Sequence, residues 1–167
     1  MAAGNTYEAI ASQTFSGSQA SLTFSSIPAT YTDLVLVCTG TASAAPYVQL
    51  NADGAANYSK TVMYGTGSSA GSSRMARTAG APNDRRIEIG SGVSADTSVN
   101  IFHFMNYSNT TTYKSVVCRG NSVTSSVVLG IGLWYSTAAI NSIVVGNTNS
   151  ANFTSATTIT LYGIAAA

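Results

Sequence analysis

Apolar and polar residues alternate in short runs along this chain, a pattern typical of β-strands rather than helices. The run Leu34–Cys38 is apolar at every position and rich in β-branched residues. A strand with one solvated face would alternate, so this run predicts a strand covered on both faces. Residues 127–135 show the most regular alternation. One parity of this second run carries Val127, Leu129, Ile131, Leu133 and Tyr135. We expect this bulky set to face a core.

The opposite parity of residues 127–135 carries two glycines beside a tryptophan. Gly130 and Gly132 leave a shelf next to Trp134, and a neighbouring strand, another subunit or a ligand must fill it. We expect Gly130, Gly132 and Trp134 to lie at a subunit interface. An alternative is that Trp134, with Tyr135 beside it, stacks a sugar ring.

Turn residues between the apolar runs predict three hairpins. Residues 7–15 are expected to pair with 20–25, and residues 99–107 with 113–119. Asp53-Gly54 is a strong turn signal that predicts pairing of 47–50 with 58–64. No segment has helical periodicity, and roughly ten short strands are expected in all. The fold class is therefore all-β: a two-sheet antiparallel β-sandwich, jelly-roll-like, forming a single domain over residues 1–167.

Residues 65–84 are dominated by Gly, Ser and Ala and are expected to form a long loop. A loop of this length inside a domain is usually functional or mobile. Four of the seven basic residues lie in or just after it: Arg74, Arg77, Arg85 and Arg86. They are candidates for charge-assisted contacts with an acidic partner surface. The alternative is a solvated loop, partly neutralised by Asp84 and Glu88.

Charged residues make up only 8% of the chain, against about 25% in typical proteins. Because the net charge is only +1, the phosphate backbone of a nucleic acid is not an expected partner. A neutral surface also allows close packing against copies of the same chain. No apolar run reaches the ~18 residues of a membrane helix, and residues 1–10 lack the features of a secretory signal. We therefore expect a soluble protein, synthesised in a cytoplasm, that binds no membrane.

Few residues are suited to metal or cofactor chemistry. Cys38 and Cys118 lie within apolar runs, where we expect buried, reduced thiols. These two cysteines and a single histidine cannot build a zinc site of the usual spacing. Asn51, Asp53 and Asn57 are a weak candidate for Ca²⁺, since only one of them is a carboxylate. We expect no metal and no cofactor.

One motif suggests hydrolase chemistry. Residues 67–71 match the G-x-S-x-G pattern, and Asp96 and His103 follow Ser69 in the order Ser, Asp, His. That motif requires a strand, a sharp turn and a helix within an α/β sheet, and this chain has no such alternation of strands and helices. The protein is therefore expected not to be an enzyme.

Several segments together carry a family resemblance. They are Phe24–Pro28, Tyr31–Val37, the N-A-D-G-A-A-N-Y-S turn at 51–59, Leu133-Trp134 followed by Ala139–Ile143, and Leu161–Ile164. Their order and spacing, over about residues 7–164, resemble a group of tailed-bacteriophage virion structural proteins. Members of that group are described as structural, capsid-decoration or tail-associated proteins.

The resemblance implies a virion protein, and the chain's length favours one type. A tail-fibre subunit normally needs an anchoring segment, whereas this chain begins its first strand near Tyr7 with no heptads before it. We therefore expect a capsid decoration (cement) protein, a homotrimer that binds the major capsid protein at the outer capsid surface and stabilises the shell. The alternative is a receptor-binding or glycan-binding head of a tail fibre or knob.

Overall fold

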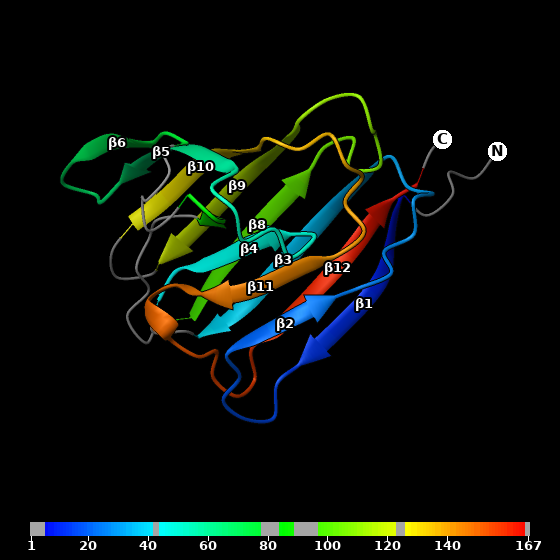
Figure 1. Cartoon of the computed structure of the whole chain (residues 1–167). Coiled ribbons are helices and arrows are strands. Elements are labelled where there is room, and N and C mark those ends of the chain that lie inside the picture. Colours follow the sequence, from blue (N-terminus) through cyan, green and yellow to red (C-terminus); the bar gives the residue numbers. More distant parts are fainter. Residues whose placement is uncertain (1–5, 42–43, 78–83, 89–96, 123–125, 166–167) are drawn as a thin grey trace.

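Two antiparallel sheets form the protein in a computed structural model that describes residues 6–41, 44–77, 84–88, 97–122 and 126–165 (Figure 1). The larger sheet has the strand order β1-β12-β3-β8-β9-β10-β5-β6, and the smaller has the order β2-β11-β4-β7. The strands are β1 Tyr7–Thr14, β2 Ser21–Phe24, β3 Asp33–Thr41, β4 Pro46–Leu50, β5 Tyr58–Gly65, β6 Ala70–Met75, β7 Ile87–Glu88, β8 Thr97–Phe104, β9 Lys114–Ser122, β10 Ser126–Trp134, β11 Ile143–Asn147 and β12 Thr158–Ile164. A short 3₁₀-helix, Thr148–Ser150, follows β11.

One hydrophobic core lies between the two sheets. In Figure 1 the smaller sheet lies across the larger one. The larger sheet contributes the fully buried Leu36 and Phe102, and the smaller sheet contributes Val48 and Ile143. The same core contains residues from Phe15 to Leu161. The predicted all-β, jelly-roll-like antiparallel sandwich is therefore confirmed.

Of the three predicted hairpins, one is correct and two are wrong. Strands β8 and β9 pair directly, as predicted. In contrast, β1 pairs with β12, while β2 pairs with β11 in the other sheet. Strands β4 and β5 also belong to different sheets. The Asp53-Gly54 turn thus carries the chain across the sandwich, where the Tyr58 hydroxyl donates to the Leu50 carbonyl at 3.2 Å and accepts from its N–H at 3.0 Å.

Strand β3 lies in the middle of the larger sheet, between β12 and β8. Its inward residues Leu34 and Leu36 have no exposed surface. On the other face Val35 is only 9% exposed, but Val37 is half-buried. The prediction that this strand is covered on both faces is therefore right for the face toward the smaller sheet and only partly right for the opposite face.

Strand β10 faces the opposite way from the prediction. Val127, Leu129 and Ile131 are 64%, 45% and 55% exposed, whereas the parity containing Gly132 and Trp134 is buried. The side chain of Ile87 from the smaller sheet occupies the space beside Gly132, where an added Cβ would lie 2.4 Å from Ile87 Cγ2. The glycine shelf is thus filled from the opposite sheet, because a bulky residue there would prevent the two sheets from approaching.

The predicted loop at 65–84 is wrong at Gly65, the last residue of β5, and over residues 70–75. Residues Ala70–Met75 form β6, which pairs along β5 from Gly65↔Ala70 to Lys60↔Met75. Ser, Gly and Arg side chains do not predict this strand, because most of its residues stay exposed and it has no alternation to detect. The β5–β6 hairpin forms one edge of the larger sheet (Figure 1). Residues 78–83 of the predicted loop lie outside the described residues.

The two cysteines are expected to titrate as free thiols. Both are buried and unpaired, and burial raises the pKa of Cys38 to about 12. Strand β8 separates their strands β3 and β9, so their Cα atoms are at least about 9.6 Å apart, beyond the roughly 7 Å limit for a disulfide. A thiol reagent should react with two cysteines in denaturant and only slowly in the native protein. The unfolding midpoint should not change with reductant; finding no reactive thiol in denaturant would contradict this prediction.

Candidate functional site

Trp134 lies in the interior of the sandwich. Its side chain is 2% exposed and stacks on Tyr58, with ring centroids 6.3 Å apart and an interplanar angle of 17°. Its indole Nε1–H donates to Asp53 Oδ2 at 2.7 Å. The predicted subunit interface at Gly130, Gly132 and Trp134 is therefore wrong, because these residues face the core. Trp134 is also not accessible to stack a sugar ring.

The side chains of Asn51 and Asp53, in the turn after β4, form hydrogen bonds with other segments of the chain. Asn51 Oδ1 accepts from the N–H groups of Asn141 and Ser142 at 2.9 and 3.2 Å, and Asn51 Nδ2 donates to the Ala139 carbonyl at 2.8 Å. Asp53 accepts from Trp134. Two of the segments that carry the family resemblance, the 51–59 turn and 133–143, thus bind each other. The hydrogen bonds between these two segments stabilise the fold.

The Asp53 carboxylate has a pKa below its usual value. Burial alone would raise this pKa, but hydrogen bonds from Asn57 Nδ2, Trp134 Nε1 and the Ala55 N–H lower it. Since these three donors are engaged within the fold, Asp53 acts as a structural acceptor. The candidate Ca²⁺ set Asn51, Asp53 and Asn57 is thus committed to bonds within the protein.

An apolar surface covers the side of the larger sheet that faces away from the smaller one. We call it the outer face and define it by side chains on β8, β9, β10 and β5: Val99, Ile101, Val117, Arg119, Val127, Leu129, Ile131, Leu133 and Met63. The strand register places Ile101 opposite Arg119, Arg119 opposite Leu129, and Leu129 opposite Met63. Arg119 is the only charged side chain in this set. An exposed apolar area of this kind on a soluble domain commonly marks a protein contact.

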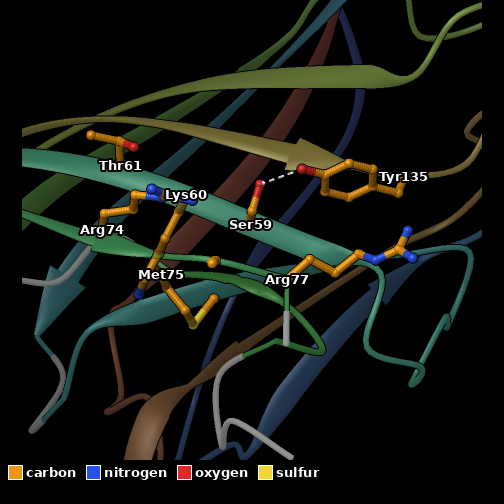
Figure 2. A pocket seen from close by; sticks show the side chains of 8 residues that line it. Ser59, Lys60, Thr61, Arg74, Met75, Arg77 and Tyr135 are labelled. Carbon is orange, nitrogen blue, oxygen red and sulfur yellow. Dashed lines mark hydrogen bonds between the residues drawn. The ribbon is translucent and has the colours of Figure 1, made fainter. Parts of the chain in front are cut away.

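A polar pocket lies at the end of the outer face, where β5, β6 and β10 meet. Its volume is about 360 Å³, and it is lined by Ser59, Lys60, Thr61, Arg74, Met75, Ala76, Arg77 and Tyr135. Figure 2 shows Tyr135 and Arg77 on one side, Arg74 and Thr61 on the other, and Ser59 between them. The Arg77 guanidinium lies 4.8 Å from the centroid of the Tyr135 ring. The Ser59 hydroxyl donates to the Tyr135 hydroxyl at 3.4 Å.

The structure brings together two of the four candidate arginines and separates the other two. Arg74 and Arg77 line the pocket. Arg86 lies 4.5 Å from the centroid of the Tyr47 ring on β4 and 3.4 Å from Glu88 Oε2 on β7. Its contacts therefore help to hold β7 beside β4. Arg85 points to solvent, with 66% of its side chain exposed. The hydroxyls of Ser59 and Thr61 were not among the predicted site residues, although their alternation with the buried Tyr58 and Val62 indicates that they lie on the opposite face.

The proposed hydrolase residues do not meet. His103 on β8 contacts Asp33 at 2.9 Å, and Ser69 lies in the β5–β6 turn, within hydrogen-bonding distance of Thr66. Strands β9, β10 and β5 lie between β8 and β6, so His103 and Ser69 are separated by roughly 19 Å of sheet. A nucleophile and its base must approach within about 3 Å. Asp96 lies outside the described residues.

The described part of the chain has neither a cluster of metal ligands nor a membrane-spanning helix. No three His, Cys, Asp or Glu side chains there lie close enough to share a metal ion. In the same residues, no helix has the length and apolar character that a membrane span requires.

Comparison with known proteins gives no assignment: no protein-family model matches the chain, and no curated protein matches it.

Proposed function

We propose that this chain is a non-enzymatic structural protein of a tailed-bacteriophage virion, a capsid decoration protein that binds the outer capsid surface and stabilises it. The observation that carries the proposal is the exposed apolar outer face, in a protein with only 8% charged residues. Such a surface suits close packing in a large assembly, because little charge must be desolvated. The family resemblance of the sequence supplies the virion context.

Self-association through the outer face is part of this proposal. Four strands spaced about 4.8 Å apart, each of about eight residues at about 3.3 Å, span roughly 19 Å by 26 Å. Each such face therefore offers roughly 500 Å² for contact with neighbouring copies. We propose a homotrimer in which different parts of each outer face contact the two neighbouring subunits. Such a ring closes without open-ended growth and matches the three-fold positions of an icosahedral shell. The outer face replaces Gly130, Gly132 and Trp134 as the proposed subunit contact.

The test is the position of the protein in the virion. Virions of the phage that encodes this chain are expected to show its density on the outer capsid by electron microscopy, and virions lacking the gene are expected to lose it. Capsids without the protein should release DNA at a lower temperature, because bound decoration subunits stabilise the assembled shell by mass action.

Adding the purified protein back to the deficient virions is the matched control, and it should restore both the density and the release temperature. Density confined to the tail would contradict the capsid proposal in favour of a receptor-binding head. Absence from the virion would contradict both.

A further inference from the structure

We infer that the pocket formed by Arg74, Arg77, Tyr135, Ser59 and Thr61 is a binding site for a carboxylate, and that in the assembled virion an acidic side chain of the capsid protein occupies it. The second half of this inference rests on the proposed function. The first half rests on the charges and contacts of the pocket alone.

The two arginines of this pocket differ from most other basic residues of the chain, because they have no acidic partner among the described residues. All seven basic residues are within the described residues. Lys60 is paired with Glu88 at 2.7 Å, Arg86 also contacts Glu88, and Arg85 lies 3.9 Å from Asp84. The buried Lys114 donates to two backbone carbonyls. Arg74, Arg77 and Arg119 have no acidic partner among the described residues, and two of these three line one pocket.

No acidic residue of the described chain lines the pocket. Glu8 accepts a hydrogen bond from Tyr31, Asp33 contacts His103, and Asp53 accepts from Trp134. Asp84 and Glu88 are near the cations named above. Within the described part of the chain, the two guanidinium groups of the pocket are therefore left without an acidic partner.

The architecture of the pocket holds these cations in place. Arg74 lies on β6 directly across from Thr61 on β5, so the strand pairing fixes the position of its backbone. Arg77 is held against the Tyr135 ring, and a cation placed over an aromatic face keeps its N–H edges available. The Tyr135 backbone N–H is in turn bonded to the Asn57 carbonyl at 2.8 Å. Preorganised donors lose less conformational entropy when a ligand binds.

The donors in the pocket match a carboxylate. A guanidinium binds a carboxylate through two parallel N–H···O bonds, and the Thr61 hydroxyl can donate to a remaining lone pair. A volume of about 360 Å³ is in the range of small-ligand sites and accepts an Asp or Glu side chain. The pocket is less suited to binding a sugar than to binding a carboxylate. The Tyr135 ring has Arg77 over it and Tyr113 at 5.5 Å, which leaves little free ring surface for stacking.

The test begins with a small probe. Titration of the full-length protein with N-acetylglutamate at constant ionic strength should shift the NMR signals of the Arg74 and Arg77 Nε–H groups. The signal of Arg85, whose side chain is 66% exposed outside this pocket and outside the outer face, should stay unchanged. The double variant Arg74→Gln/Arg77→Gln should bind the probe at least ten-fold more weakly, while Arg85→Gln, the matched control, binds it as the wild type does.

The second arm measures attachment to capsids lacking the protein. The Arg74→Gln/Arg77→Gln variant is expected to bind at least ten-fold more weakly with a reduced dependence on salt, and Arg85→Gln is expected to bind normally. Equal response of all three arginines to the probe would overturn the carboxylate site. Tighter binding of glucuronic acid than of N-acetylglutamate would replace the protein carboxylate with an acidic sugar.

The two arms separate the two proposals. If the probe binds Arg74 and Arg77 but the wild-type protein does not attach to capsids, the proposed function fails and the carboxylate site stands. If attachment is normal and the double variant attaches equally well, the capsid acid does not occupy this pocket and the inference fails.

Discussion

Replacing Trp134 with Ala is expected to lower the free energy of unfolding by about 3–5 kcal/mol, the usual cost of removing a buried aromatic side chain. The substitution removes a 2% exposed ring, its stacking on Tyr58, and the indole donor to Asp53. Urea unfolding followed by circular dichroism measures the change, since the chain has a single Trp and its fluorescence is lost. Tyr135→Ala, at the neighbouring half-buried aromatic, is the control and should cost less. A loss for Trp134→Ala below about 1 kcal/mol would contradict the burial of this residue.

Trp134→Phe separates the hydrogen bond from the packing. It should cost about 1 kcal/mol, the typical value of one hydrogen bond at a partly exposed acceptor. The pKa of Asp53 is lowered in the folded protein, so the ionised carboxylate stabilises the fold above its unfolded pKa of about 3.9. This contribution is lost as the pH falls through the lower, folded-state pKa. Without the indole donor the folded pKa rises toward the unfolded one, and the variant should lose less stability on acidification than the wild type.

Replacing Ile131 with Asp is expected to dissociate the oligomer without unfolding the subunit. Ile131 is 55% exposed near the middle of the outer face, opposite Val117 on β9. A carboxylate there would have to lose its hydration when two copies pack together, and losing a central contact costs about 2 kcal/mol or more, which corresponds to roughly 30-fold weaker association. Sedimentation at micromolar concentration should show an oligomer for the wild type and a monomer for Ile131→Asp.

The matched control for this experiment is Thr23→Asp. Thr23 is exposed on β2, on the opposite side of the sandwich, and its replacement adds the same charge away from the proposed contact. It should leave the oligomer intact. A wild-type monomer would contradict self-association altogether, and an oligomer that survives Ile131→Asp would exclude the outer face as its contact.

The class of the fold follows from local sequence patterns. Period-two alternation and β-branched residues predict strands, because side chains of a strand point alternately to its two faces. This was enough to place β3, β4, β10 and β12 and to predict an all-β sandwich. It was also enough for the β8–β9 hairpin, in which both strands are neighbours in the chain and in the sheet.

The candidate site was only partly predictable. Four arginines near residues 74–86 were identified from their clustering in sequence, yet only Arg74 and Arg77 share a pocket. Tyr135, whose ring contacts Arg77, lies 58 positions after it in the sequence. Contacts between such distant segments leave no local sequence pattern. Strand β6 was missed because an edge strand exposed on both faces has no apolar alternation.

Two features, the assignment of β4 and β5 to different sheets and the choice of the buried face of β10, depend on the tertiary structure. A turn such as Asp53-Gly54 reverses the chain equally well within one sheet or between two, so local chemistry could not tell that β4 and β5 lie in different sheets. Alternation in β10 likewise defines two sets of residues without stating which set is inside. The bulky set appeared suited to the core, but Ile87 and Tyr58 fill the space over Gly132 and Trp134. The apolar residues Val127, Leu129 and Ile131 therefore remain outside, because the volume of a core is filled by both sheets together.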